Sequence, residues 1–305
     1  MPRGRLGVTL IELIVAMTVA GIVLSTIAAI SLRGQRLFAD LAGARAAAAR
    51  VREGSDILPL ELRGASPASG DIMEARDTAL VVRGTIATGV ACTVAGGALA
   101  LAPADTGVES YGGVLTPVDS GDTAWVVAPS ETIPSWVGYR IVATSTTAPP
   151  DSACDSPGPH LDVAARSVPT LRLTLAGAPS LAGMVGMPVR VTRVMRYSLY
   201  RAADGGWYLG ERDWNAALSS FNGIQPVSGP FRSPSSSIGS GLMLSYFDSL
   251  GAALASPVSD TRRIVAVEIV LRAQPAPGGG PTASRSGVVT SSDSARRYVM
   301  IHNRG

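Results

Sequence analysis

The chain reads GVTLIELIVAM over residues 7–17, and the apolar run that begins there continues to Leu32 with Glu12 as its only charged residue. At about 1.5 Å per residue, a helix over residues 8–32 is roughly 37 Å long, which is enough to cross a hydrocarbon core about 30 Å thick. We therefore expect residues 8–32 to span a membrane. Arg3 and Arg5 precede the run, and positive charges there favour a cytoplasmic N terminus, with the rest of the chain on the other side.

An ionisable side chain at membrane depth is costly, so Glu12 is a functional candidate that needs a partner. Residues 4–32, with Gly7 followed by Val-Thr-Leu-Ile-Glu at the head of a hydrophobic helix, resemble the class III signal of type IV pilins and type II secretion pseudopilins. The resemblance implies that a prepilin peptidase cleaves between Gly7 and Val8 and methylates the new amino terminus of Val8. Glu12 then becomes the fifth mature residue, a position that the family reserves for glutamate. Val8 departs from the family pattern, in which phenylalanine is commonest.

The need for a glutamate at this position also has a physical reason. Cleavage after Gly7 leaves a cationic amine on an apolar helix, and a filament that stacks such helices must bury this amine. At an effective dielectric of about 20, two unit charges about 4 Å apart attract by roughly 4 kcal/mol, which is comparable to the cost of a charge at membrane depth. Pairing with the carboxylate of Glu12 on a neighbouring subunit would therefore favour one register between subunits.

Three other interpretations of the apolar run are weaker. A cleaved secretory signal peptide has an apolar region of about 7–15 residues, which is shorter than this run. A plain signal anchor leaves Gly7 and Glu12 unexplained. A buried core helix would need a protein shell around its whole circumference, and nothing downstream in the sequence supplies one.

Small residues form a stripe on one face of the expected membrane helix. They recur at steps of three and four residues, as Thr18, Gly21, Ser25 and Ala28. Small side chains allow helices to approach closely in lipid, so we expect this face to pack against neighbouring subunits.

The helix is expected to continue beyond Leu32 as an amphipathic segment over residues 33–64, because apolar residues persist at steps of three and four. Gly54 and Pro59 predict that regular helix ends near residues 53–58, with a kinked turn before Gly64. The expected organisation is a leader (1–7), a membrane-spanning segment (8–32), its amphipathic continuation (33–64) and a β-rich periplasmic head (65–305).

Strand patterns dominate the head. Leu171–Leu175 alternates strictly, and a hairpin is expected between residues 189–200 and 207–209 over Asp204-Gly205-Gly206. Further strands are expected at 79–82, 124–127, 137–142, 242–248 and 264–271. Residues 85–165 are expected to be an insertion of short strands and long loops, and 228–241 and 275–287 are expected to be linkers. The fold class is α+β: a long N-terminal helix packed on an antiparallel sheet.

The C-terminal half also carries a resemblance. The order of a hairpin ending in aromatic residues, the segments 244–251 and 262–272, and the ending at 301–304 is similar to that in larger minor pilins of the PilW kind and in J-type minor pseudopilins. The resemblance implies a rare subunit of a filament rather than the repeating one.

Composition excludes several kinds of chemistry. The chain has no lysine, which excludes a Walker A loop and Schiff-base catalysis. Its net charge of +3 comes from scattered arginines, so we do not expect nucleic-acid binding. Cys92 and Cys154 are the only cysteines, and an even count in an exported chain predicts a disulfide between them, with two free buried thiols as the alternative.

Candidate catalytic and metal-binding residues are sparse. His160 and His302 are the only histidines, and neither lies in a metal-ligand spacing. Four acidic residues lie in a glycine-rich loop, which we expect to be solvated rather than to bind calcium. They are Asp105, Glu109, Asp119 and Asp122. We expect no enzyme activity, no cofactor and no metal.

The functional hypothesis is a minor pilin or pseudopilin of the bacterial inner membrane that assembles near the tip of a type IV pilus or type II secretion pseudopilus. Its expected partners are the prepilin peptidase, major and other minor pilins, the inner-membrane assembly platform and membrane lipids. The alternatives are a membrane-anchored periplasmic ligand-binding protein and a DNA-uptake tip subunit.

The cleavage hypothesis makes a direct prediction about Gly7. Because the peptidase must accommodate a residue without a side chain before the scissile bond, Gly7→Leu should leave a full-length, unmethylated precursor in the inner membrane. Immunoblotting of membrane fractions measures the size of the product. Mature protein of normal size from this variant would contradict cleavage between Gly7 and Val8.

Overall fold

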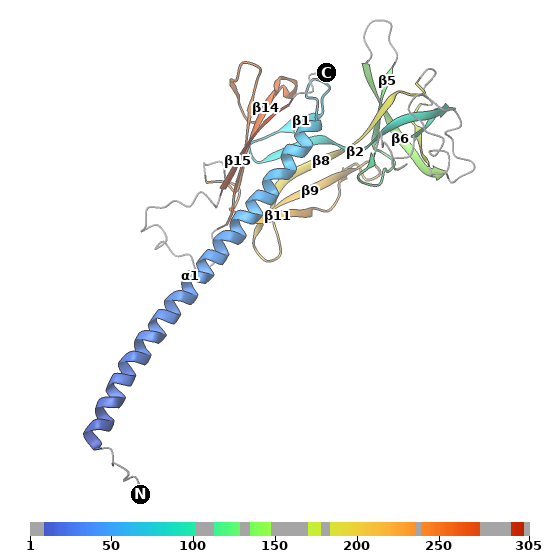
Figure 1. Ribbon diagram of the computed structural model, residues 1–305. Coiled ribbons are helices and arrows are strands. Elements are labelled where there is room, and N and C mark those ends of the chain that lie inside the picture. Colours follow the sequence, from blue (N-terminus) through green and yellow to red (C-terminus); the bar gives the residue numbers. More distant parts are fainter. Residues whose placement is uncertain are drawn as a thin grey trace.

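The computed structural model describes residues 9–101, 113–128, 135–147, 170–177, 184–235, 239–274 and 294–301. The molecule has one long helix, α1 (Leu10–Gly64), and a head of antiparallel strands at the C-terminal end of that helix (Figure 1). The α+β class expected from the sequence is therefore confirmed.

The described strands form two sheets. The larger sheet comprises β1 (Ile72–Ala75), β2 (Ala79–Ala95), β3 (Ala98–Leu101), β4 (Gly113–Val114), β5 (Thr123–Ala128), β6 (Ser135–Thr147), β7 (Thr170–Leu175), β8 (Pro188–Arg201), β9 (Trp207–Asn215), β10 (Ser220–Phe221) and β11 (Gln225–Phe231). The smaller sheet has the order β13 (Ala253–Leu254), β12 (Leu242–Phe247), β14 (Ala266–Arg272), β15 (Ser294–Met300). A short 3-10 helix, η2 (Thr261–Arg263), precedes β14.

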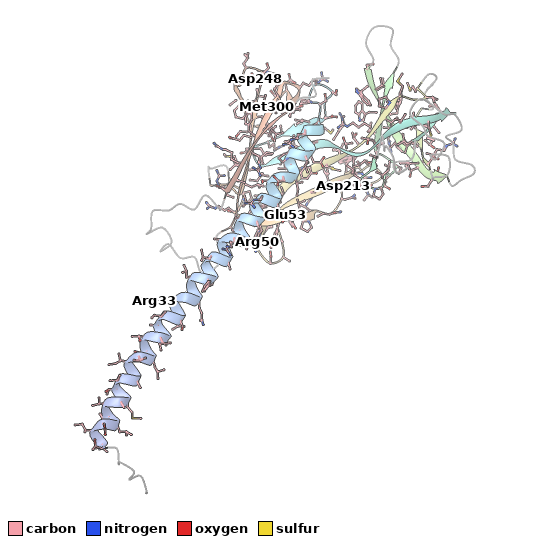
Figure 2. The ribbon with its side chains drawn as sticks, viewed as in Figure 1. Arg33, Arg50, Glu53, Asp213, Asp248 and Met300 are labelled. Atoms are coloured by element: carbon pink, nitrogen blue, oxygen red, sulfur yellow. The ribbon has the colours of Figure 1, made fainter. Side chains whose placement is uncertain are left out.

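Helix α1 is 55 residues long, and the head covers only its C-terminal part. Residues 9–33 are exposed throughout, and this part of the helix projects away from the head (Figure 1). Within the described part of the chain, α1 is the one helix that is long and apolar enough to cross a membrane. Figure 2 shows Arg33 on the projecting part, and Arg50 and Glu53 where the helix reaches the head.

The C-terminal part of α1 docks on strands from both sheets. Val51, Leu58 and Leu62 are buried, and the helix contacts β2, β11, β14 and β15. A Cβ atom placed on Gly54 would lie only 3.0 Å from Cζ of Phe231, so this glycine marks a close approach of the helix backbone to the sheet. The docking is therefore an apolar contact that depends on a small residue in the helix.

The predicted end of the helix was wrong. Regular helix continues through Pro59 to Gly64 instead of ending near residues 53–58. Pro59 removes one backbone hydrogen bond. Leu58, directly before it, and Leu62, three residues after it, are fully buried against the head, and burial of such side chains contributes about 1.5–3 kcal/mol each, which offsets the loss.

Strands of the larger sheet close into a ring. The pairings run β2–β3–β7–β6–β5–β8, and β8 pairs again with β2. Register shifts within β2, between Thr85 and Ala87 and between Ala91 and Thr93, bend this strand so that it takes part in both sides of the ring. Residues 85–165 were expected to be an insertion of short strands, but β2 has 17 residues and β6 has 13, and both are built into the ring.

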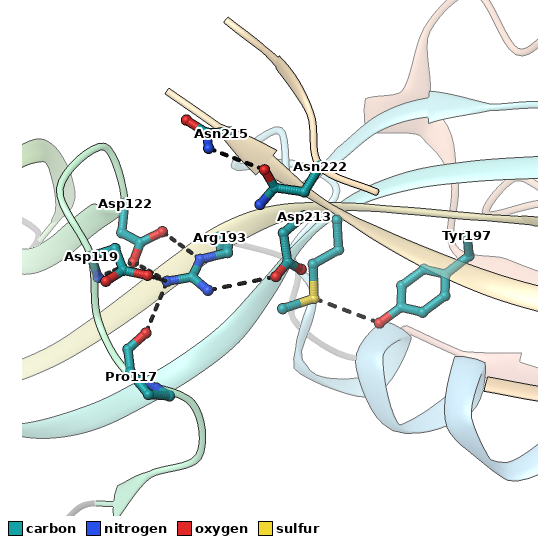
Figure 3. Close-up of polar contacts among 9 residues, drawn as sticks. Pro117, Asp119, Asp122, Arg193, Tyr197, Asp213, Asn215 and Asn222 are labelled. Atoms are coloured by element: carbon teal, nitrogen blue, oxygen red, sulfur yellow. Dashed lines mark hydrogen bonds and ion pairs between the residues drawn. The ribbon is translucent and has the colours of Figure 1, made fainter. Parts of the chain in front are cut away.

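A buried arginine joins the ring to β9 (Figure 3). Arg193 on β8 donates from Nε and Nη2 to the two carboxylate oxygens of Asp122, each at 2.8 Å. Its Nη2 also donates to Asp119 at 3.0 Å and to the carbonyl of Pro117 at 2.9 Å, and its Nη1 lies 3.7 Å from Asp213. The hydrogen bond to Asp122 raises the pKa of Arg193, which therefore stays charged.

The remaining local expectations have mixed outcomes. The β8–β9 hairpin over Asp204-Gly205-Gly206 is confirmed, and Leu171–Leu175 lies within β7 with alternating burial. The expected linker at 228–241 was wrong at its start, because Ser228 to Phe231 belong to β11. The expected linker at 275–287 lies outside the described residues.

Docking of α1 can be tested with two leucines of the same helical turn. Leu58 is fully buried, whereas Leu60 is 65% exposed. Leu58→Ala should lower the free energy of unfolding by about 2–5 kcal/mol through lost burial and a residual cavity, and Leu60→Ala should change it by less than about 0.5 kcal/mol. Denaturant unfolding of the full chain in detergent micelles measures both. Equal effects of the two substitutions would contradict this docking geometry.

Candidate processing and assembly site

The described part of the N-terminal site begins at Thr9, the second residue after the expected cleavage point. Gly7 and Val8 lie outside the described residues. Thr9 is the N-cap of α1 and has an extended backbone, with φ −76° and ψ 149°. Val8 would be the mature amino terminus, Thr9 follows it, and the helix begins at Leu10.

Thr9 and Glu12 form a reciprocal capping box. The backbone N–H of Glu12 donates to Oγ1 of Thr9, and the backbone N–H of Thr9 donates to Oε2 of Glu12, both at 3.4 Å. This arrangement satisfies two N–H groups that a helix start leaves without intrahelical partners. Glu12 also lies in the first turn, where its negative charge interacts favourably with the helix dipole.

The capping role leaves the carboxylate of Glu12 with further binding capacity. Its side chain is exposed, and no hydrogen bond to Oε1 occurs among the described residues. An ionised carboxylate can accept about four hydrogen bonds, and hydrogen bonds from a charged donor are the stronger ones. The geometry therefore allows Glu12 to cap its own helix and still receive a cationic amine.

The spacing of Thr18, Gly21, Ser25 and Ala28 within α1 places them on one face, and all four are exposed. Thr18 Oγ1 donates to the carbonyl of Val15 at 2.9 Å, and Ser25 Oγ donates to the carbonyl of Ile22 at 2.8 Å. Their hydroxyls are thus satisfied within the helix, which lowers the cost of placing them in lipid. A Cβ atom on Gly21 would have no neighbour within 4 Å, so this face has room for another helix, and packing there stays a prediction.

In the head, Cys92 is buried on β2 and is disulfide-bonded. Cys154 lies outside the described residues, so the Cys92–Cys154 pairing stays a prediction.

Of the four acidic residues expected to be solvated, Asp122 is not, whereas Asp119 is exposed. Asp122 is buried, and it binds Arg193 together with the exposed Asp119. Asp105, Glu109, His160 and His302 lie outside the described residues. Among the residues that the structure describes, no group of three or more His, Cys, Asp or Glu side chains is placed to hold a metal ion.

Sequence reasoning missed the role of Thr9 as the capping partner of Glu12. The signal was available, because a threonine three residues before a glutamate at the head of an apolar run is the capping-box pattern.

Comparison with known families addresses the N-terminal segment. Residues 2–28 match the prokaryotic N-terminal methylation motif. No curated protein and no solved structure matches the chain. The motif implies processing by a prepilin peptidase and assembly with other pilins, and the long apolar helix that begins within it, at Leu10, is consistent with anchoring in the inner membrane. Residues 2–28 together with the projecting helix thus support a type IV pilin-like or pseudopilin-like subunit.

Proposed function

We propose that this protein is a minor pilin or minor pseudopilin, a structural subunit rather than an enzyme. It is inserted in the bacterial inner membrane through α1 with its head in the periplasm. A prepilin peptidase cleaves between Gly7 and Val8 and methylates Val8, and the subunit is then incorporated near the tip of a type IV pilus or type II secretion pseudopilus.

The observation that carries this proposal is the exposure of the N-terminal part of α1, most of which lies within the methylation motif. Large apolar side chains along this part are uncovered, such as Leu10 at 79%, Ile22 at 65% and Ile30 at 69% exposure. Such a surface needs lipid before assembly and neighbouring helices after it. A helix that served only as a tether would need lipid alone, without a cleavage glycine or a carboxylate at its start.

The position near the tip is supported by the size and shape of the head. Residues 65–305 follow the helix, and the ring of strands around β5 and β6 extends the head sideways from the axis of α1 (Figure 1). A head of this width would crowd its neighbours if it were repeated along a filament shaft. A terminal position avoids this crowding on one side.

One observation favours the alternative of a membrane-anchored ligand-binding protein. A groove of about 590 Å³ lies between α1 and the β8–β9 hairpin, and it is lined by Arg50, Arg201, Asp204 and Tyr208 among others. Asp204 already accepts hydrogen bonds from Tyr208 and from the backbone of Gly206. The two arginines of this groove would attract a small anionic ligand, whereas the carboxylate of Asp204 would repel it. This function is therefore the second candidate.

The proposal is tested at Glu12, where two roles must be separated. Glu12→Gln keeps an acceptor for the capping box but loses the charge, whereas Glu12→Leu loses both. If the carboxylate pairs with the mature amine of a neighbour, Glu12→Leu should be cleaved normally but should be incorporated at least tenfold less, because each loss of about 1.4 kcal/mol corresponds to about a factor of ten. Glu12→Gln should show an intermediate defect.

The measurement is the ratio of mature protein in sheared filaments to mature protein in the membrane. Glu53→Gln is the matched control, because Glu53 is an exposed glutamate on the same helix outside the expected membrane segment. A wild-type ratio for Glu12→Gln with a reduced ratio for Glu12→Leu would assign the effect to capping alone. An undiminished ratio for Glu12→Leu would contradict the charge-pair mechanism and favour the membrane-anchored ligand-binding protein.

A further inference from the structure

Acidic side chains gather where the last turns of α1 meet the sheet. Glu61 lies on α1 between the fully buried Leu58 and Leu62. A Cβ atom placed on Gly84 of β2 would lie 2.7 Å from Oε2 of Glu61 and 2.7 Å from Sδ of Met195 on β8. The carboxylate of Glu61 therefore lies directly over the backbone of β2, in a space that exists because residue 84 has no side chain.

Strand β9 brings two more carboxylates to this region. Glu211 pairs across the sheet with Tyr197, and Asp213 pairs with Met195, so the two acidic residues are neighbours on one face of β9. Tyr197 is 1% exposed, and its hydroxyl contacts Met195 Sδ at 3.6 Å (Figure 3). Burial raises the pKa of Tyr197, and the charges of Glu61 and Glu211 raise it further, so this phenol stays neutral.

The nearby arginines bind carboxylates other than those of Glu61 and Glu211. Arg193 binds Asp122, Asp119 and Asp213. Arg190 donates to Asp71 at 2.8 Å and to Thr85 at 2.7 Å.

No hydrogen bond or ion pair to Glu61 occurs among the described residues, so Arg190 acts on Glu61 only through its field. The charged and titratable groups that act on Glu61 are Glu211 of β9 and Arg190 and Tyr197 of β8. Asp213 of β9 acts on Glu211, and Arg193 of β8 lies 3.7 Å from Asp213.

This environment favours the neutral form of both glutamates. Burial raises the pKa of Glu61, the charge of Glu211 raises it further, and the charge of Arg190 opposes both effects. Burial also raises the pKa of Glu211, against a hydrogen bond from Tyr197 that lowers it, and the charge of Asp213 adds to the increase. The folded protein therefore binds protons at these two positions more tightly than the unfolded chain does.

We propose that Glu61 and Glu211 form an acid-stabilised latch between the end of α1 and the sheet, in which protonation removes the repulsion between two half-buried carboxylates and tightens the docking of the helix. The stabilisation is fully present below the ordinary glutamate pKa and is lost as the pH rises through the raised values of the folded state. The docking of α1 on the head would therefore be most stable at acidic pH.

The test uses the full chain in detergent micelles between pH 4.5 and pH 8. Glutamine keeps the shape of protonated glutamate and cannot ionise, so Glu61→Gln and Glu211→Gln should each raise Tm above that of the wild type at pH 8, by about 2 °C or more. The difference should shrink towards zero at pH 4.5. Comparing each variant with the wild type at the same pH cancels the titration of all other groups.

Glu53→Gln is the control, because Glu53 is exposed on the same helix, and it should follow the wild type at every pH. A local readout supports the assignment: amide hydrogen exchange over residues 58–64, corrected for the intrinsic effect of pH, should be at least threefold faster at pH 8 than at pH 5 in the wild type. This ratio should fall towards one in Glu61→Gln. A Tm difference that is absent or negative at pH 8, or that does not vary with pH, would overturn the latch, as would an unchanged exchange ratio.

Discussion

The apolar contact between the last turns of α1 and the head is the constraint on which the arrangement of the molecule depends. Val51, Leu58 and Leu62 are buried there, and Gly54 lets the helix backbone approach Phe231. Because the head holds only this end of a 55-residue helix, the direction of the remaining helix is set by the contact. The exposed N-terminal part follows from the same fact, and its apolar surface must be covered by lipid or by other helices.

Polar contacts join the helix end to the rest of the head. After the C-cap at Ala65, the backbone N–H of Ser66 donates to Asp71 at 2.8 Å, and Arg190 of β8 donates to the same carboxylate oxygen. Asp71 is 1% exposed and Arg190 is partly exposed, so removing the arginine would leave a buried carboxylate without this partner, which is destabilising. Arg193, three residues further along β8, binds Asp122 and Asp119, which precede β5 in the ring. Strand β8 therefore carries the arginines that bind both the segment after α1 and the segment before β5.

Sequence reasoning succeeded where local pattern decides the structure. The strict alternation at Leu171–Leu175 and the hairpin at Asp204–Gly206 depend on neighbouring residues, and both were predicted. It failed where distant residues decide. Continuation of α1 through Pro59 depends on burial against strands far along the chain. Closure of the ring depends on pairs such as Ala79 with Ser198, and the ion pair between Arg193 and Asp122 spans 71 residues. No local signal identifies such partners.

The most direct test of the account is the mass of the N-terminal peptide of the wild-type protein purified from membranes and from sheared filaments. We expect this peptide to begin at Val8 and to carry one methyl group on its amino nitrogen. A peptide that retains Gly7 and the residues before it, or one that begins at Val8 without a methyl group in both fractions, would contradict prepilin-type processing.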